Sequence, residues 1–194
     1  MSIKDDLAYL WSISSFVGLS VFIFFLTAVM GYWAAGVDPD LATQWRAELD
    51  ALKWILEQPP LMIMIIIFLK NLLASAMAML LGLGLGLIPL LVVTSNGFLL
   101  GIVAYSAVQQ SGPLFLAAGI LPHGILELPA VLVSIAIGFR LGYLLAFTLA
   151  REKADLSGET KIAVRFLWRY IGPLLFLAAI IETFITPIAI SVVS

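Results

Sequence analysis

The chain has 194 residues, of which 62% are hydrophobic and only 11% are charged. A soluble domain carries about 25% charged residues, so this composition excludes an ordinary soluble protein and predicts an integral membrane protein. The net charge of −2 gives no indication of a nucleic-acid partner, and a chain without cysteine has no disulfide framework.

Several apolar stretches are long enough to cross a membrane as single helices. A bilayer core of about 30 Å needs about 20 helical residues, and residues 13–35, 61–81, 87–108 and 168–193 meet this length. The N-terminus lacks the basic region and cleavage site of a signal peptide, so the first stretch is expected to remain as a membrane helix. The pattern predicts one all-α domain over residues 1–194, a polytopic bundle of transmembrane helices.

Residues 38–57, between the first two spans, are predicted to form an amphipathic helix. Leu41, Trp45 and Leu49 recur at helical spacing, with charged residues between them. Such a helix lies at the membrane interface, and a connecting helix in water is the alternative.

Residues 82–89 separate the second span from the third. Gly82, Gly84, Gly86 and Pro89 disfavour a continuous straight helix here. The pattern predicts a tight hairpin. A discontinuous helix that lines a cavity is the alternative, since broken helices at membrane depth occur where protein or water covers the backbone.

The apolar region 114–150 is too long for one span, because as a single helix it would measure about 55 Å at about 1.5 Å per residue. We predict a break at Pro122-His123-Gly124, which gives a short segment, 114–121, and a long helix, 125–150. The bundle then has about five spans. If the short segment is re-entrant instead, every span upstream crosses the membrane in the opposite direction.

The connection 151–169 is the most basic one in the chain. The positive-inside rule predicts that it is a cytoplasmic loop. The C-terminus then lies outside the cell, and with five crossings the N-terminus lies inside.

Pairs of small residues four positions apart occur in several spans. Such pairs let helices approach closely, so at least one pair is expected to mark a tight contact, and together they favour a homodimer. The pairs are Gly82 and Gly86, Gly97 and Gly101, and Gly138 and Gly142.

Four ionisable side chains fall within apolar stretches, namely Lys70, Glu127, Arg140 and Glu182. Each costs roughly 2.5–3.5 kcal/mol to insert, so each needs a partner or water. Two are basic and two acidic, which indicates internal pairing, and an ion pair between Lys70 and Glu182 is expected.

His123, the only histidine, and Glu127 lie one helical turn apart and share a helix face. Pro129 lacks an N–H, which frees the carbonyl of Ile125. Unpaired backbone groups and polar side chains therefore meet near Gly124, and the first interpretation is a structural lock that holds the broken helix together.

Two functional interpretations compete with this lock. One is a proton or ion relay through His123, Glu127, Lys70 and Glu182. The other is a metal site, for which His123 and Glu127 are usable ligands but too few without Glu182 or a second copy of the chain.

Motifs of enzyme chemistry are absent. The sequence has no G-x-S-x-G elbow, no HExxH and no phosphate-binding loop. It therefore predicts a non-enzymatic protein without a cofactor.

Residues 120–142, ILPHGILELPAVLVSIAIGFRLG, resemble the signature of the stage II sporulation protein M family. Asn71, in FLKNLLAS, and Asn96, in SNGFLLG, resemble the family's asparagines in the second and third spans. The resemblance covers about residues 60–190. The signature positions are Pro122, His123, Gly124, Glu127, Pro129, Gly138 and Gly142.

The resemblance implies a multi-pass bundle in the plasma membrane with a scaffold role. The family's namesake in spore formers anchors a peptidoglycan-remodelling complex during engulfment. Relatives occur in bacteria and archaea that do not sporulate, so the partner cannot simply be carried over.

The expected function is therefore a non-enzymatic scaffold that contacts lipids, an unknown protein partner and a second copy of itself, but no nucleic acid. The alternative is a transporter or channel for a small ion or solute, and a metal-binding intramembrane enzyme is a third possibility. A transporter needs a water-accessible cavity that reaches the intramembrane polar groups, whereas a scaffold can bury them dry and paired. These polar groups are His123, Glu127, Lys70, Asn71, Asn96 and Glu182.

Overall fold

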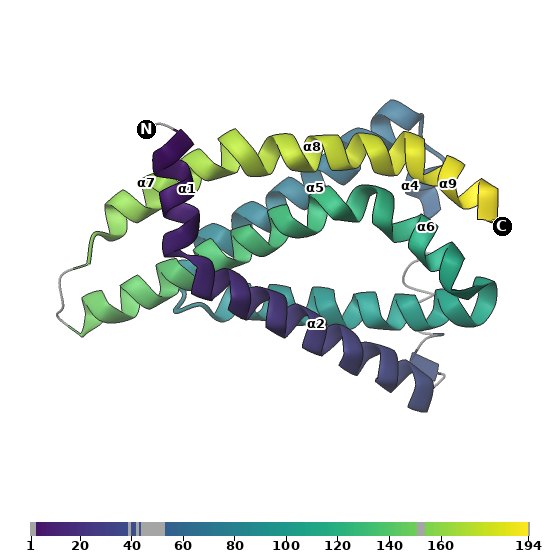
Figure 1. Ribbon diagram of the computed structural model, residues 1–194, viewed down its shortest axis with the longest axis horizontal. Helices are drawn as coiled ribbons and strands as arrows, with labels where there is room; N and C mark the ends of the chain where they lie inside the picture. The colour runs from purple at the N-terminus through teal and green to yellow at the C-terminus, as the bar shows by residue number, and fades with distance from the viewer. Residues whose placement is uncertain (1–2, 39, 42, 44–52, 151–153, 194) are drawn as a thin grey trace.

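Figure 1 shows the computed structural model, an elongated bundle whose helices run between two ends. The structure describes residues 3–38, 40–41, 43, 53–150 and 154–193. Within these ranges the chain forms helices and no strand, which confirms the predicted all-α class. The elements are α1 (Ile3–Ser12), α2 (Ser14–Val37), α4 (Lys53–Leu56), α5 (Pro60–Leu80), η1 (Leu81–Leu83), α6 (Leu87–Leu149), α7 (Leu156–Phe166), η2 (Leu167–Ile171), α8 (Gly172–Ile180), η3 (Ile181–Ile185) and α9 (Thr186–Val193).

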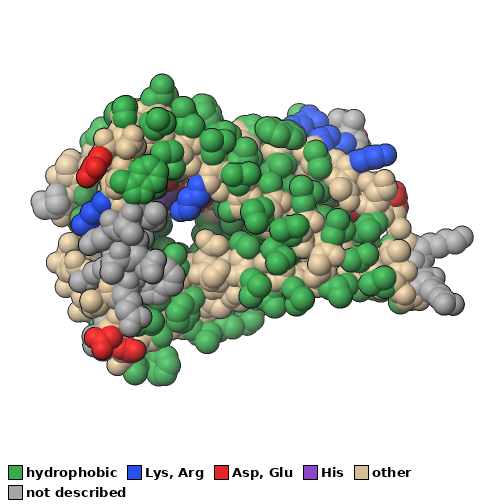
Figure 2. Space-filling view, turned by 180° about the vertical axis from the view of Figure 1, so that it is seen from behind, with side chains coloured by type: hydrophobic (Ala, Val, Ile, Leu, Met, Phe, Trp, Pro, Cys, Tyr) green, Lys and Arg blue, Asp and Glu red, His purple; other side chains and the backbone are tan. Residues whose placement is uncertain are grey.

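Apolar side chains cover the outside of the bundle. Four helical stretches of the described chain are long and apolar enough to cross a membrane: Ser14–Val37, Pro60–Leu83, Leu87–Leu149 and Leu156–Val193. In Figure 2 hydrophobic side chains occupy most of the visible face, and charged side chains gather toward its two ends. A surface of this kind suits lipid rather than water, so the protein is an integral membrane protein.

The third of these stretches, α6, doubles back at Gly112. This residue has φ 86° and ψ 171°, a backbone region that is essentially restricted to glycine. α6 therefore consists of two antiparallel arms, 87–111 and 113–149 (Figure 1). When the two arms of α6 are counted separately, the four apolar stretches provide five segments, in agreement with the predicted number of about five spans.

The predicted break at Pro122-His123-Gly124 was wrong, because the second arm stays helical through these residues and bends instead (Figure 1). A proline leaves one carbonyl without its helical N–H partner, and this kinks a membrane helix without ending it when neighbouring groups cover the turn. The segments 114–121 and 125–150 are therefore parts of one bent helix.

The connection between α5 and α6 is the predicted tight hairpin. η1 tightens the end of α5, and Leu85 (φ 57°) and Gly86 (φ 78°) then take left-handed conformations. The N–H of Gly86 donates to the carbonyl of Gly82 at 2.9 Å and closes the turn.

The second arm of α6 is the centre of the bundle. Its side chains Ile135, Ile137 and Leu141 are fully buried, and α2, α5 and α8 all pack against α6. A helix that is apolar on every side belongs in such a central position.

Glycines bring helix backbones into contact in this centre. A Cβ atom on Gly138 would collide with the carbonyl oxygen of Ala78, and one on Gly101 with that of Ala28. The glycines in such backbone contacts are Gly31, Gly82, Gly97, Gly101, Gly138 and Gly142. Because these contacts lie within one chain, the small residues that suggested a homodimer are already used for packing.

Two predicted segments are only partly described. Most of the amphipathic helix predicted at 38–57 lies outside the described residues, and of its described part residues 40–41, 43 and α4 are helical. The predicted loop 151–169 is helical from Leu156 onward, because Asp155 caps α7 by accepting a hydrogen bond from the N–H of Gly158 at 2.8 Å.

Candidate ion-binding site

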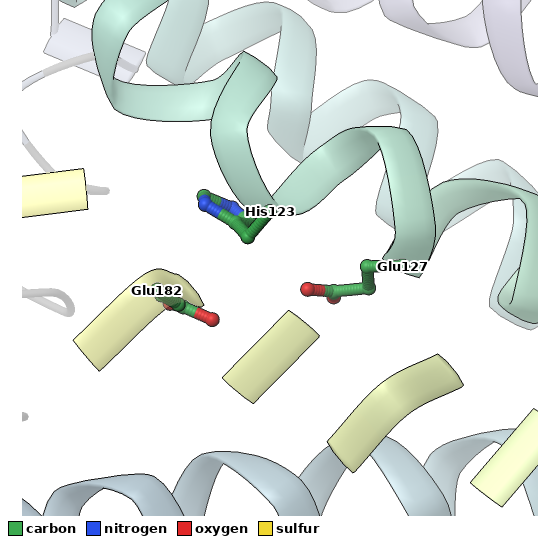
Figure 3. A group of neighbouring side chains, drawn as sticks. All are labelled: His123, Glu127 and Glu182. Atoms are coloured by element: carbon green, nitrogen blue, oxygen red, sulfur yellow. The ribbon is translucent and has the colours of Figure 1, made fainter. Parts of the chain in front are cut away.

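Three of the predicted polar side chains converge between α6 and η3. His123 and Glu127 lie one turn apart on the second arm of α6, and Glu182 lies on η3. One ligand atom from each side chain lies within 4.8 Å of the other two, and all three residues are half-buried. Figure 3 shows the three side chains pointing into the same space.

Glu182 reaches this space from an irregular helical turn. η3 is a π-helix, in which the N–H of Thr186 donates to the carbonyl of Ile181. Pro187 follows and has no N–H to donate, so the hydrogen-bond pattern widens just before it. Single π turns within α-helices occur frequently at functional sites.

Thr186 orients His123. Its hydroxyl donates to the carbonyl of Ile181 at 3.3 Å, which leaves the hydroxyl oxygen to accept. Nδ1 of His123 lies 3.3 Å from that oxygen. This arrangement assigns the imidazole proton to Nδ1 and leaves the lone pair of Nε2 free to bind a ligand.

Neither carboxylate of the site forms an ion pair with a basic side chain in the described part of the chain. Among the described residues, no ion pair within 4.0 Å joins Glu127 or Glu182 to Lys70. The expected Lys70–Glu182 pair does not form, and Lys70 is exposed on α5 whereas Glu182 is half-buried on η3.

His123 and Glu127 share a helix face as predicted, yet no hydrogen bond between them is found in the part of the chain that the structure describes. The imidazole faces Thr186 instead. The two side chains therefore do not satisfy each other, and the structural lock and the ligand site both stay predictions.

A cavity of about 570 Å³ lies between α2 and the two arms of α6, and its lining includes His123 and Glu127 but not Glu182. Its wall is mostly apolar and includes the polar side chains of His123, Glu127 and Asn96. The amide of Asn96 donates to the carbonyl of Val92 on its own helix at 2.8 Å. Asn71, half-buried on α5, is not part of this wall.

Arg140 belongs to a different cluster, where α1 meets α7. Its Nε lies 2.6 Å from Oε1 of Glu159, and the hydroxyl of Tyr9 donates to the same oxygen at 2.7 Å. Burial, reinforced by the Glu159 carboxylate, raises the pKa of Tyr9. Arg140 is therefore partnered outside the intramembrane set to which the sequence assigned it.

Asp6 anchors α1 beside this cluster. Its carboxylate oxygens lie 3.3 Å from Arg165 and 3.0 Å from Arg169, and the hydroxyl of Tyr170 donates to it at 2.8 Å. These contacts tie α1 to α7 and η2, so one end of the bundle is held together by ion pairs.

Fold and site together define a class, an all-α integral membrane protein whose apolar helices hold one imidazole and two carboxylates within reach of one another. The chain belongs to the stage II sporulation protein M family, whose sequence profile matches residues 20–187. The match begins further upstream than the resemblance over 60–190 and includes the 38–57 segment.

A relative in an archaeon supports the assignment. An uncharacterized protein of Methanocaldococcus jannaschii is 36% identical over 94 residues, which are 47% of this chain and 53% of that protein. The chain thus spans about half the length of this curated relative. No solved structure matches the chain.

Sequence reasoning missed Thr186 and Glu159. Thr186 lies one helical turn after Glu182, so the same spacing that linked His123 to Glu127 could have identified it. Glu159 follows a basic stretch, and nothing local indicated that Tyr9, at the other end of the chain, would donate to it.

Proposed function

We propose that this membrane protein binds a small cation at His123, Glu127 and Glu182 and transports it across the membrane. The observation that carries the proposal is the convergence of three ligand-bearing side chains within 4.8 Å between apolar helices. Ionisable groups at such depth mark ion or proton pathways by default. A dry scaffold would pair these groups with one another.

The surroundings of the site support transport. His123 and Glu127 line the cavity, Pro122 and Pro129 interrupt the hydrogen bonds of α6 beside them, and η3 is a π-helix. In transporters, coupling ions bind near the bilayer midplane where helices are discontinuous or bent.

Flux through liposomes tests the proposal. Purified protein is reconstituted into vesicles that contain a proton-sensitive dye or a dye for divalent metals. We expect wild-type flux well above that of empty vesicles and a loss of about tenfold or more for Glu127→Gln, which removes a charge but keeps the shape. Glu57→Gln, at an exposed position, is the matched control. Wild-type vesicles that pass neither ion would overturn the proposal.

The scaffold function is the second candidate, and the ion-paired end of the bundle favours it. The buried carboxylates of Asp6 and Glu159 pair with arginines and fix α1 against α7, so a partner complex could dock on an end of the bundle that is held in place. The test places a photo-cross-linker at exposed Lys161 on this end and at Val192 on the other. A scaffold predicts one defined cross-linked protein at position 161 and none at 192, whereas equal, diffuse cross-linking would contradict it.

A further inference from the structure

We infer that the ion held by His123, Glu127 and Glu182 is a divalent transition-metal ion. The inference rests on the proposed function only in using the same site, and metal binding can be measured without transport.

The donor atoms indicate the class of ion. One imidazole nitrogen and two carboxylates form a mixed nitrogen and oxygen set, which suits Zn²⁺, Co²⁺, Mn²⁺ or Fe²⁺. Ca²⁺ takes six or more oxygen ligands and Mg²⁺ prefers an octahedron of oxygens, so neither matches a set that includes His123.

The spacing of the donors fits one ion. Metal–ligand bonds of about 2.0–2.2 Å in a tetrahedral arrangement place the donors of one ion about 3.3–3.6 Å apart. The donors of the three side chains lie within 4.8 Å of one another, so side-chain rotations that move them by about 1 Å bring all three to one ion. Three protein ligands leave a further coordination position for water or for the next ligand on the path.

Charge favours a dication over a monovalent ion. Two carboxylates this close repel each other inside an apolar bundle, and no basic group forms an ion pair with either one within the described residues. A divalent ion neutralises both. Lys70, exposed on α5, forms no ion pair with either carboxylate.

Thr186 supplies the hydrogen-bond acceptor that the second ring nitrogen of a metal-binding histidine usually has. A ligating histidine donates its other N–H to an acceptor, which fixes the ring and its tautomer. Here the acceptor is the hydroxyl oxygen of Thr186, buried at 6% exposure and itself held by the Ile181 carbonyl. The lone pair of Nε2 of His123 is thereby left available for the ion.

Cobalt binding tests the inference on the full chain purified in detergent without added metal. Co²⁺ is titrated and followed by its visible absorption, with Zn²⁺ as competitor and Mg²⁺ as the ion that should not compete. We expect about one Co²⁺ per chain, and Glu182→Gln and His123→Gln should each weaken binding at least about tenfold. Thr186→Val should weaken it by about tenfold although its side chain touches no metal. Glu57→Gln should bind as the wild type does.

The outcomes separate the two proposals. Wild-type protein without a cobalt spectrum, or Glu182→Gln with unchanged affinity, overturns the inference even if proton flux is found in liposomes. Metal binding without flux overturns transport and leaves the metal site standing. If the His123 and Glu182 variants do not fold, the melting temperature of the wild type tests metal binding instead. It should rise with Co²⁺ or Zn²⁺ and not with Mg²⁺, and an unchanged melting temperature would overturn the inference.

Discussion

At the scale of single residues, Tyr9 shows how one hydroxyl joins distant parts of the chain. The ring is buried at 6% exposure, and its hydroxyl donates to Glu159, which also holds Arg140. A hydrogen bond from a buried phenol to a carboxylate contributes about 1.5–3 kcal/mol. Tyr9 therefore stabilises the contact between α1 and α7 as long as it keeps its proton.

This dependence on a proton predicts an alkaline effect on stability. Burial and Glu159 raise the pKa of Tyr9 above its usual value of about 10. A raised folded-state pKa gives a contribution that is fully present below about pH 10 and is lost as the pH rises further. Between pH 8 and 11 the melting temperature of wild type should fall more steeply than that of Tyr9→Phe. Tyr143→Phe, at an exposed ring, should follow the wild type, and parallel curves for wild type and Tyr9→Phe would contradict the assignment.

At the scale of elements, the central arm of α6 depends on glycine. A Cβ atom at Gly138 would meet the backbone of Ala78, which cannot move aside as a side chain can. We expect Gly138→Ala to destabilise the protein by about 1–3 kcal/mol, measured by thermal unfolding in detergent. Gly18→Ala is the control, because open space surrounds Gly18 on α2 and alanine is the better helix former there. Equal stability of the two variants would show that the close packing contributes nothing.

The reversal at Gly112 gives a second prediction at this scale. Its φ of 86° and ψ of 171° are strained for any residue with a Cβ, so Gly112→Ala should cost about 1–3 kcal/mol although open space surrounds it. Gly119→Ala, on the helical part of the same arm, should be neutral or stabilising. The same unfolding measurement applies, and a Gly112→Ala variant as stable as Gly119→Ala would contradict the assignment of the reversal to the backbone conformation of Gly112.

The contrast between Gly112 and Pro122 shows which features of the fold can be predicted from the sequence. Apolar length and glycine-rich hairpins are local properties, so the spans and the turn at Gly86 could be predicted. The site could be predicted only in part, because His123 and Glu127 share one helix face, whereas the approach of Glu182 depends on tertiary packing. Prolines in a membrane helix do not by themselves distinguish a bend from a break, since neighbouring helices decide between them.

At the scale of the whole molecule, the two ends of the bundle indicate how it is oriented in the membrane. The N-terminus, the hairpin at Gly86 and α7 lie at one end, and the turn at Gly112 and the C-terminus lie at the other (Figure 1). The ion-paired arginines of α7 and η2 mark the first end, which the positive-inside rule assigns to the cytoplasm. Five crossings follow if each helical stretch, and each arm of α6, runs from one end to the other.

Single cysteines can test this orientation directly, because the chain has none of its own. Ser111→Cys lies at the reversal of α6 and Lys161→Cys on α7, and both positions are exposed. In intact cells a membrane-impermeant maleimide should label position 111, and it should label position 161 only after the membrane is permeabilised. A re-entrant segment after Gly112 would instead leave both positions protected in intact cells. Labelling of both variants in detergent is the control, because it shows that protection comes from the membrane rather than from the fold.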